Sequence, residues 1–213
     1  MSDIFREIDE ELRRDNLMKL WRQYGRYVII GVVVVLAIAA GIVAWRNHQL
    51  AERQATSVRY AAAMQLLREG KDADATKVFD AVAREGSGYG TLADFEAADL
   101  AVKSGDRKAA VAAYDRIAAS SNLDAELRDV ATLLSVMNSF GDTDPQAEIT
   151  RLKPLTDAGN PWHATALELT ASAQLQAGNK TAALDIYKQL ADDQHAPEGV
   201  RSRAAELASA LKP

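Results

Sequence analysis

The most uneven feature of the hydrophobic pattern is an uncharged run near the N-terminus. Nineteen residues, "YVIIGVVVVLAIAAGIVAW" at 27–45, separate Arg26 from Arg46. A helix of that length rises about 29 Å, which matches the about 30 Å hydrocarbon core of a bilayer. Because lipid offers no partners to backbone polar groups, we expect a helix here despite the many valines and isoleucines. Tyr27 and Trp45 lie at its ends, where interfacial aromatic side chains are favoured.

A cleaved signal peptide and a buried soluble helix are the alternatives for this run. A signal peptide begins with a short basic leader, whereas the 26 residues before the run contain six acidic side chains. The rest of the chain is not apolar enough to surround such a helix on every side. We therefore predict an uncleaved single transmembrane helix at residues 27–45.

The flanking segments predict the orientation of this helix. Residues 12–26 contain five basic side chains and residues 46–60 contain three, so the positive-inside rule places the N-terminus in the cytoplasm. Residues 1–26 are then a cytoplasmic leader and residues 46–213 a domain in the periplasm, with the bacterial inner membrane between them. Part of the leader forms an amphipathic pattern that is typical of contact with membrane lipid; its apolar members are Leu17, Leu20, Trp21 and Tyr24. A solvated leader that only sets the topology is the alternative.

A repeat follows the apolar run. No glycine or proline occurs between Ile42 and Glu69, so one continuous helix is expected to leave the membrane. Glycines then stand at 70, 105, 141 and 178, at spacings of 35, 36 and 37 residues. After three of them an alanine follows at five residues, an aromatic residue at nine and an apolar residue at twelve: Ala75, Phe79 and Val82; Ala110, Tyr114 and Ile117; Ala183, Tyr187 and Leu190.

This spacing is that of a tetratricopeptide repeat, a helix–turn–helix unit of about 34 residues. The glycine ends the first helix, the small alanine lets the second helix approach it, and the aromatic ring fills the space toward the next unit. The predicted fold is therefore all-α, with a transmembrane helix followed by a solenoid of helical hairpins. The unit at Gly141 has Gln146 and Thr150 at the alanine and aromatic positions, and prolines at 145 and 154, so its helices should be distorted. A last helix after His195, with solvated Arg201 and Arg203, would cap the array.

Charge and chemistry narrow the classes of function. Residues 46–213 carry nineteen basic and twenty-four acidic side chains, which argues against nucleic acid as a partner. The sequence has no cysteine, and its three histidines are far apart and lack metal-ligand spacing. The glycine-rich "GSGYG" at 86–90 follows a predicted helix rather than a strand, so it is interpreted as a loop between repeats. We predict no enzyme, no cofactor and no metal.

The first helix of each unit should line a concave face on which a partner protein binds. Counting back from each glycine predicts the residues of this face: Tyr60, Met64, Leu92, Phe95, Asp99, Thr165, Glu168 and Ser172. The mixture of apolar and polar side chains suits transient contact with extended chains. Packing of Leu92 and Phe95 between units is the alternative.

Several segments together resemble one bacterial family. They are "LWRQYGR", "AWRNHQ", "SVRYAAAM", "YGTLADFEAA" and "PWHATALELTASAQLQAGNKTAALDIYKQLADD". In this order the chain resembles the tetratricopeptide-like inner-membrane proteins described as ancillary subunits of the Sec translocon. The resemblance implies a single-pass protein whose periplasmic domain associates with translocon subunits, with a membrane-anchored periplasmic chaperone of the prolyl-isomerase type, and with exported client proteins. It implies no catalytic residues.

Two other functions remain open from the residues. One is a scaffold for cell-envelope assembly or division, because repeat proteins of this kind serve there too. The other is a regulator whose acidic leader binds a cytoplasmic signalling protein.

Overall fold

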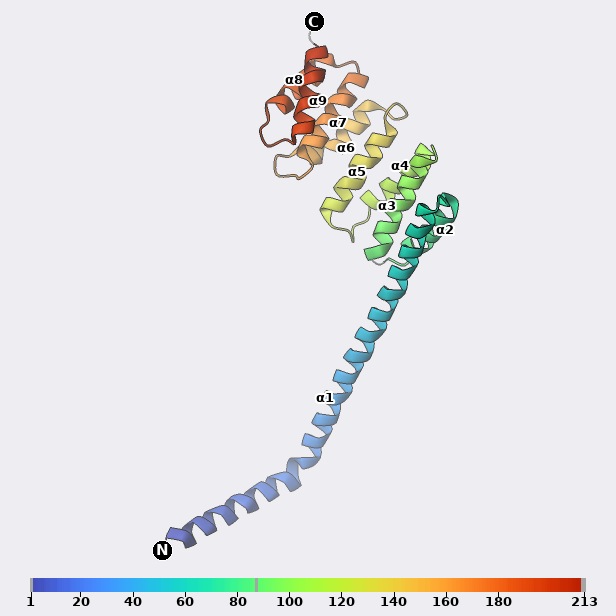
Figure 1. The fold of residues 1–213 in the computed structure, drawn as a ribbon. Helices are drawn as coiled ribbons and strands as arrows, with labels where there is room; N and C mark the ends of the chain where they lie inside the picture. The colour runs from blue at the N-terminus through green and yellow to red at the C-terminus, as the bar shows by residue number, and fades with distance from the viewer. Residues whose placement is uncertain (1, 87, 212–213) are drawn as a thin grey trace. The chain divides into compact units, whose positions relative to one another are not determined.

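The computed structural model describes the backbone of residues 2–86 and 88–211, and the side chains of residues 18, 21–27, 29–86 and 88–211. Within these ranges all regular secondary structure is helical, which confirms the predicted all-α class (Figure 1). The chain divides into two compact units, Met1–Ala55 and Thr56–Pro213. The second unit begins ten residues after the start predicted for the repeat domain.

The first helix, α1, runs from Ser2 to Arg68. The expected continuity between the apolar run and the first repeat is thus confirmed. Among the described residues, α1 is the one helix long and apolar enough to cross a membrane, with a mean hydropathy of 2.9 in its most apolar stretch and no part of that stretch buried. Leu17 and Leu20, two members of the predicted amphipathic face, lie outside the described side chains.

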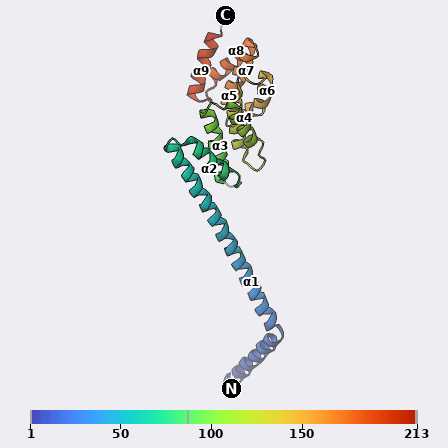
Figure 2. The same ribbon diagram turned by 90° about the vertical axis from the view of Figure 1, so that its right-hand side faces the viewer.

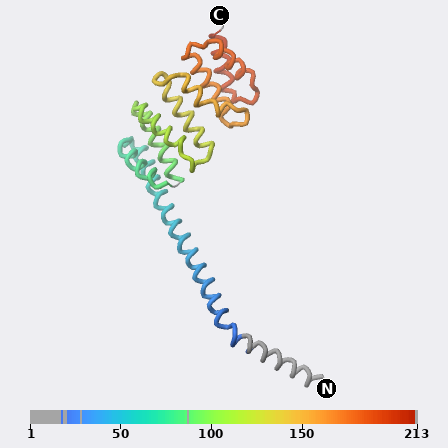
Figure 3. The backbone as a smooth tube through the Cα atoms, turned by 180° about the vertical axis from the view of Figure 1, so that it is seen from behind, coloured from blue at the N-terminus to red at the C-terminus, as the bar shows by residue number. Residues whose placement is uncertain are grey.

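The repeats form consecutive helical hairpins. The end of α1 pairs with α2, and each later hairpin follows in sequence order (Figures 1 and 2). The bounds are α2 Asp72–Ala83, α3 Gly88–Lys103, α4 Arg107–Ala118, α5 Ala125–Ser139, α6 Pro145–Leu152, the 3-10 helix η1 Lys153–Thr156, α7 His163–Gln176, α8 Lys180–Asp192 and α9 Glu198–Ala210. The tube in Figure 3 follows the chain through these hairpins from α2 to the C-terminal helix α9.

The four periodic glycines make the turns inside the hairpins. Gly105, for example, has a φ of 82°, a left-handed conformation that a side chain disfavours. The next amide, of Asp106, donates to the carbonyl of Ala101 at 2.9 Å, which closes the helix end in a Schellman-type turn. A hydrogen bond that spans five residues in the same way joins the amide of Lys71 to the carbonyl of Leu66, and another joins the amide of Asn179 to the carbonyl of Gln174. The predicted role of the glycines as helix terminators is therefore confirmed.

The residues that follow these glycines form the core. Ala75, Ala110 and Ala183 are completely buried, and so is Phe79. The other core positions predicted from the repeat are no more than 3 % exposed: Val82, Tyr114, Ile117, Tyr187 and Leu190. An alanine at the closest point of two helices leaves room for the large rings one turn later, which explains why both are needed at a fixed spacing.

The third unit is distorted, as predicted, and the structure shows why. Helix α6 has only eight residues and continues as the 3-10 helix η1, which contains Pro154. The second helix starts four residues after Gly141, whereas it starts two residues after the other three glycines. Shifting the repeat by two residues places Glu148, Leu152 and Leu155 at the alanine, aromatic and apolar positions, and all three are buried.

The interpretation of "GSGYG" as a loop is wrong for its last three residues. Gly88, Tyr89 and Gly90 form the first turn of α3. A Cβ atom on Gly90 would lie 3.2 Å from the carbonyl oxygens of Val82 and Ala83. Gly90 therefore lets α3 begin directly against the end of α2, whereas Gly86, with a φ of 65°, lies in the turn before it.

The buried Glu148 leads to a prediction about how the stability of the fold depends on pH. Its side chain is fully buried, its Oε1 accepts a hydrogen bond from Ser139 at 2.9 Å, and its Oε2 has no partner. Burial raises the pKa of Glu148 above its ordinary value of 4.5, against the lowering effects of Ser139 and Arg151. Because the folded state then binds the proton more tightly, the contribution of Glu148 to stability is fully present below pH 4.5 and is lost as the pH rises through the folded pKa.

We expect Glu148→Gln to remove this fall and to raise the free energy of unfolding at pH 7 by about 1 kcal/mol, because it removes a buried charge. Urea unfolding of the full chain in detergent, followed by circular dichroism from pH 4 to 8, measures the effect. The exposed Glu206→Gln is the matched control. Identical pH dependence in wild type and Glu148→Gln would contradict the prediction.

Candidate partner-binding face

The residues of the predicted face fall into groups according to how many residues they precede the turn glycine in the sequence. Six residues before Gly105 and Gly178 stand Asp99 and Ser172, and each contacts the aromatic ring of its own hairpin. The Tyr114 hydroxyl donates to the Asp99 carboxylate, and the hydroxyls of Tyr187 and Ser172 lie 3.1 Å apart. Met64, at the same position in the first unit, packs in the cluster around Phe79. This position therefore ties the two helices of a hairpin together.

Ser135, in the third unit, occupies the same position but has different partners. With the second helix shifted, no tyrosine faces it. Its hydroxyl instead donates to Asp115 of α4 at 2.6 Å, and Arg151 of α6 contacts both residues, at 2.5 Å from Asp115 and 3.0 Å from Ser135. The polar contact at this position thus joins neighbouring hairpins where it cannot be made within one.

Ten residues before the glycines stand Tyr60 and Phe95, which lie half-buried among other rings. The Tyr60 ring centroid lies 5.5 Å from that of Phe79 and 5.5 Å from that of Tyr89, and the Phe95 centroid lies 6.3 Å from that of Tyr114. The Tyr60 hydroxyl donates to Oε1 of Glu96 at 3.3 Å. This bond joins the first helices of two successive units at their predicted inner surface.

Burial and the neighbouring carboxylates act on the two phenols in the same direction. Burial, and then the charge of Glu96, raises the pKa of Tyr60. Burial, and then the hydrogen bond to Asp99, raises the pKa of Tyr114. Both phenols therefore remain neutral donors at physiological pH, and the negative charge of the two carboxylates is not offset by them.

Leu92 and Thr165 stand thirteen residues before their glycines, and Leu92 is the more open of the two. Its side chain is 48 % exposed, whereas Thr165 is half-buried. About half of the Leu92 side chain is thus available for contact with another molecule. Tyr89, one helical turn earlier on α3, is also exposed, at 40 %.

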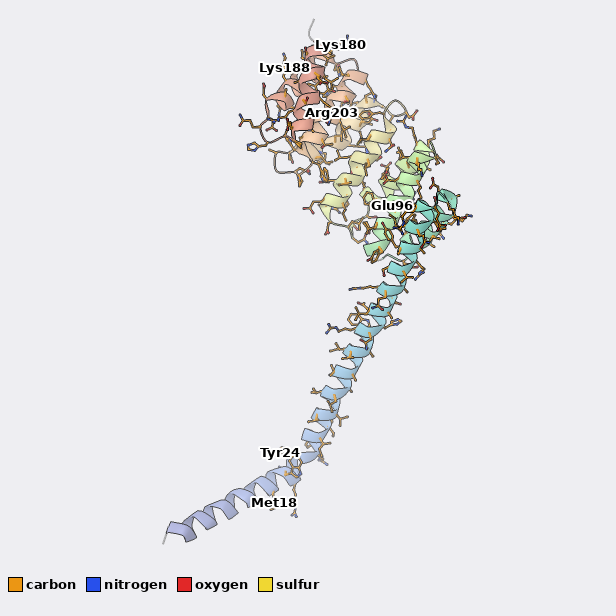
Figure 4. The ribbon with its side chains drawn as sticks, in the orientation of Figure 1. Met18, Tyr24, Glu96, Lys180, Lys188 and Arg203 are labelled. Carbon is orange, nitrogen blue, oxygen red and sulfur yellow. The ribbon has the colours of Figure 1, made fainter. Side chains whose placement is uncertain are left out.

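The C-terminal part of the predicted face is occupied by the chain itself. Two guanidinium nitrogens of Arg203 on α9, Nε and Nη2, donate to the carboxylate of Glu168 on α7 at 2.7 and 2.8 Å, and the Glu168 side chain is only 16 % exposed. The Arg203 side chain is 57 % exposed, as expected for a solvated capping helix, but it also reaches back to the last hairpin through this ion pair (Figure 4). The arginine meets a carboxylate in a two-pronged geometry.

A pocket of about 220 Å³ opens between the end of α1 and α3. It is lined by Leu67, Glu96, Asp99, Leu100 and Lys103, and Figure 4 shows Glu96 on α3 where the two helices meet. The ammonium group of Lys103 lies 2.6 Å from the carboxylate of Asp72 on α2. Of the predicted residues, Asp99 lines this pocket, Tyr60 and Met64 pack in the cluster around Phe79, and Phe95 packs in the cluster around Tyr114.

Sequence reasoning missed Tyr89 and Glu96 on this face. Tyr89 belongs to the "GSGYG" stretch that the sequence interprets as a loop, whereas it lies in the first turn of α3. Glu96 lies three residues before Asp99, a spacing that places both on one side of a helix. That spacing was the available signal. Within the described residues, no three histidine, aspartate or glutamate side chains gather as a metal ion would require.

Comparison with known proteins identifies the class of protein to which these helical hairpins belong. Residues 18–209 match the tetratricopeptide repeat-like domain family, and this chain belongs to that family. It is also similar to an ancillary SecYEG translocon subunit from Aggregatibacter actinomycetemcomitans, with 26 % identity over 194 residues, 90 % of this chain and 93 % of that protein.

Solved structures agree on the fold. A crystal structure of nearly identical TPR-like repeats from Podosopora anserina superposes with a TM-score of 0.55 at 13 % identity, covering 72 % of this chain and 83 % of that one. The MamA protein gives a TM-score of 0.54 at 13 % identity, covering 73 % of this chain and 89 % of that one. These similarities confirm the repeat architecture.

The two tyrosine contacts give a prediction about stability. Tyr114→Phe removes a donor from a charged acceptor, and Tyr187→Phe removes a contact between two hydroxyls. We expect the first to lower the free energy of unfolding by about 1–2 kcal/mol and the second by less than about 1 kcal/mol. Urea midpoints of the full chain in detergent measure both. A larger loss for Tyr187→Phe would contradict the assignment of Asp99 as the stronger partner.

Proposed function

We propose that this protein is a membrane-anchored interaction module of the Sec translocon that assists newly exported proteins in the periplasm. The observation that supports it most strongly is the match to an ancillary SecYEG translocon subunit along nearly the whole of both chains. A match of that extent includes the apolar helix as well as the repeats. The proposed role is non-catalytic, with no cofactor, and its working surface is the inner face of the first hairpins.

The proposed anchor is the segment at residues 27–45. Its large side chains are exposed where the structure describes them, including Tyr27 at 56 % and Trp45 at 64 %. In water so much exposed apolar surface is unfavourable, whereas lipid solvates it. The Arg26 guanidinium lies 4.8 Å above the Tyr27 ring and donates to its hydroxyl at 2.9 Å. This pair suits the level of the lipid headgroups, where a charge and an amphipathic ring are both favoured.

The proposed topology has the N-terminus in the cytoplasm and the repeats in the periplasm, as the basic residues before the span favour. The chain has no cysteine, so single cysteines report the topology cleanly. We expect a membrane-impermeant maleimide to label Gln176→Cys in cells with a permeabilised outer membrane, and Ser2→Cys only after lysis. The reverse pattern would contradict this topology.

The proposed clients are exported chains, because an exposed mixture of apolar and polar groups suits brief contact with unfolded segments. A membrane-anchored periplasmic chaperone of the prolyl-isomerase type is the further partner that we propose. It would receive the client after the repeats release it. The acidic leader remains a candidate for a separate cytoplasmic contact.

Photo-crosslinking tests the proposed partners. We expect a photoreactive amino acid in place of the exposed Leu92 to crosslink to translocon subunits and exported clients in intact membranes. The same probe in place of the exposed Lys188 of α8 is the control and should not (Figure 4). Crosslinks from Leu92 to cell-wall synthesis proteins instead would favour the envelope scaffold. Translocon crosslinks that disappear when residues 3–15 are deleted would favour action through the leader.

A further inference from the structure

The pocket beside α3 combines an apolar floor with two carboxylates. Leu67 and Leu100 belong to its lining, and Leu100 is 7 % exposed. Glu96 and Asp99 line it too, each with one oxygen engaged by a phenol: Oε1 of Glu96 by Tyr60 and Oδ1 of Asp99 by Tyr114. The second oxygen of each carboxylate is held by neither phenol. An incoming donor therefore meets two negative groups above an aliphatic surface.

The lining contains two carboxylates, of Glu96 and Asp99, against the single ammonium group of Lys103. Lys103 is paired with Asp72 through an Nζ–Oδ2 distance of 2.6 Å, so its charge is already matched on the α2 side. Lysine and arginine side chains favour surroundings of this kind, because their methylene stems cover apolar surface while the charged head reaches polar partners. Charge complementarity thus identifies the chemistry of the occupant.

The apolar end of the same helix face adds a second contact. Tyr89, Leu92, Glu96 and Asp99 follow one another at intervals of three, four and three residues, so they lie along one side of α3. The seven residues from Leu92 to Asp99 rise about 10 Å along the helix. An extended chain covers that distance in about three residues.

We propose that this pocket binds one lysine or arginine side chain of an extended polypeptide segment, whose apolar residue about three positions away packs on Leu92. The inference rests on the proposed function, since it specifies what the first hairpins would recognise in a translocon loop or an exported chain. The carboxylates of Glu96 and Asp99 hold the cationic head, and the two phenols keep those carboxylates in place. The segment is selected by charge at one position and by apolar surface at the other.

Peptide binding to the full-length protein in nanodiscs of neutral phosphatidylcholine tests the proposal, with empty nanodiscs as the blank. The probe is a labelled nine-residue peptide, Ser-Gly-Leu-Ser-Thr-Arg-Ser-Gly-Ser. A second peptide has glutamine in place of arginine. We expect the arginine peptide to bind about tenfold more tightly, as for a charged hydrogen-bonded pair, and this advantage to shrink as salt is added.

Matched variants assign that advantage to the pocket. Glu96→Gln with Asp99→Asn should abolish the preference for arginine, whereas Asp185→Asn with Glu206→Gln, the same charge change at exposed positions of α8 and α9, should preserve it. Leu92→Gln changes an exposed side chain and keeps the fold. It should weaken both peptides by a similar factor of about three, through loss of apolar contact.

Three results would overturn the inference: equal binding of the two peptides by the wild type, an arginine preference that survives Glu96→Gln with Asp99→Asn, or self-association that this double variant abolishes, which would assign the groove to a second copy. The proposed function is judged separately. If the Leu92 probe still crosslinks to translocon subunits while the arginine preference is absent, the pocket assignment fails and the translocon role stands. If the arginine preference is present without those crosslinks, the pocket assignment stands and the translocon role fails.

Discussion

The repeat domain depends on one close contact, made where an alanine of the second helix meets the first helix of the same hairpin. Ala75, Ala110 and Ala183 have no exposed surface, so nothing larger fits there without moving a helix. This approach brings the ring four residues later across the hairpin, where Tyr114 reaches Asp99 and Tyr187 reaches Ser172. The alanine thus determines both the hairpin geometry and which inner-face residues are restrained. The surface that a partner could contact is therefore limited to the side chains of the predicted face that the aromatic rings do not cover.

The third hairpin shows what happens when that contact changes. Its second helix starts two residues late, and Glu148 occupies the alanine position. A buried carboxyl group there needs hydrogen-bond partners, and Ser139 donates to only one of its two oxygens. The helix soon gives way to a 3-10 turn. A polar group at the point of closest packing therefore accompanies a shorter helix, and the serine that elsewhere would face a tyrosine instead joins neighbouring hairpins through Asp115 and Arg151.

The sequence was sufficient for the architecture because the features that define it are local and periodic. A glycine that ends a helix and an alanine five residues later are visible without any knowledge of tertiary contacts, and the structure confirms them. The two-residue shift after Gly141 is not visible in the sequence, because the repeat pattern expects the alanine, aromatic and apolar residues at fixed intervals after each glycine. The face was harder to predict, since exposure depends on what other helices cover. Glu168 looked available, but Arg203, 35 residues later, lies on it. Tyr89 was missed because glycines that serve packing resemble glycines that serve a turn.

The open part of the predicted face is formed by α3 together with the end of α1, the helix that also contains the proposed anchor. Tyr60 and Leu67 belong to α1, as does the apolar run at residues 27–45. No glycine or proline interrupts the sequence from Ile42 to Glu69, and both segments belong to the one helix α1. A binding site attached this way has a high effective concentration for ligands near the same membrane, and weak contacts are then sufficient. The C-terminal part of the face, where α9 reaches Glu168, needs no such ligand, because the chain supplies its own cation. The difference between the two parts of the face is thus a difference in the source of positive charge: Arg203 at one, and the proposed partner at the other.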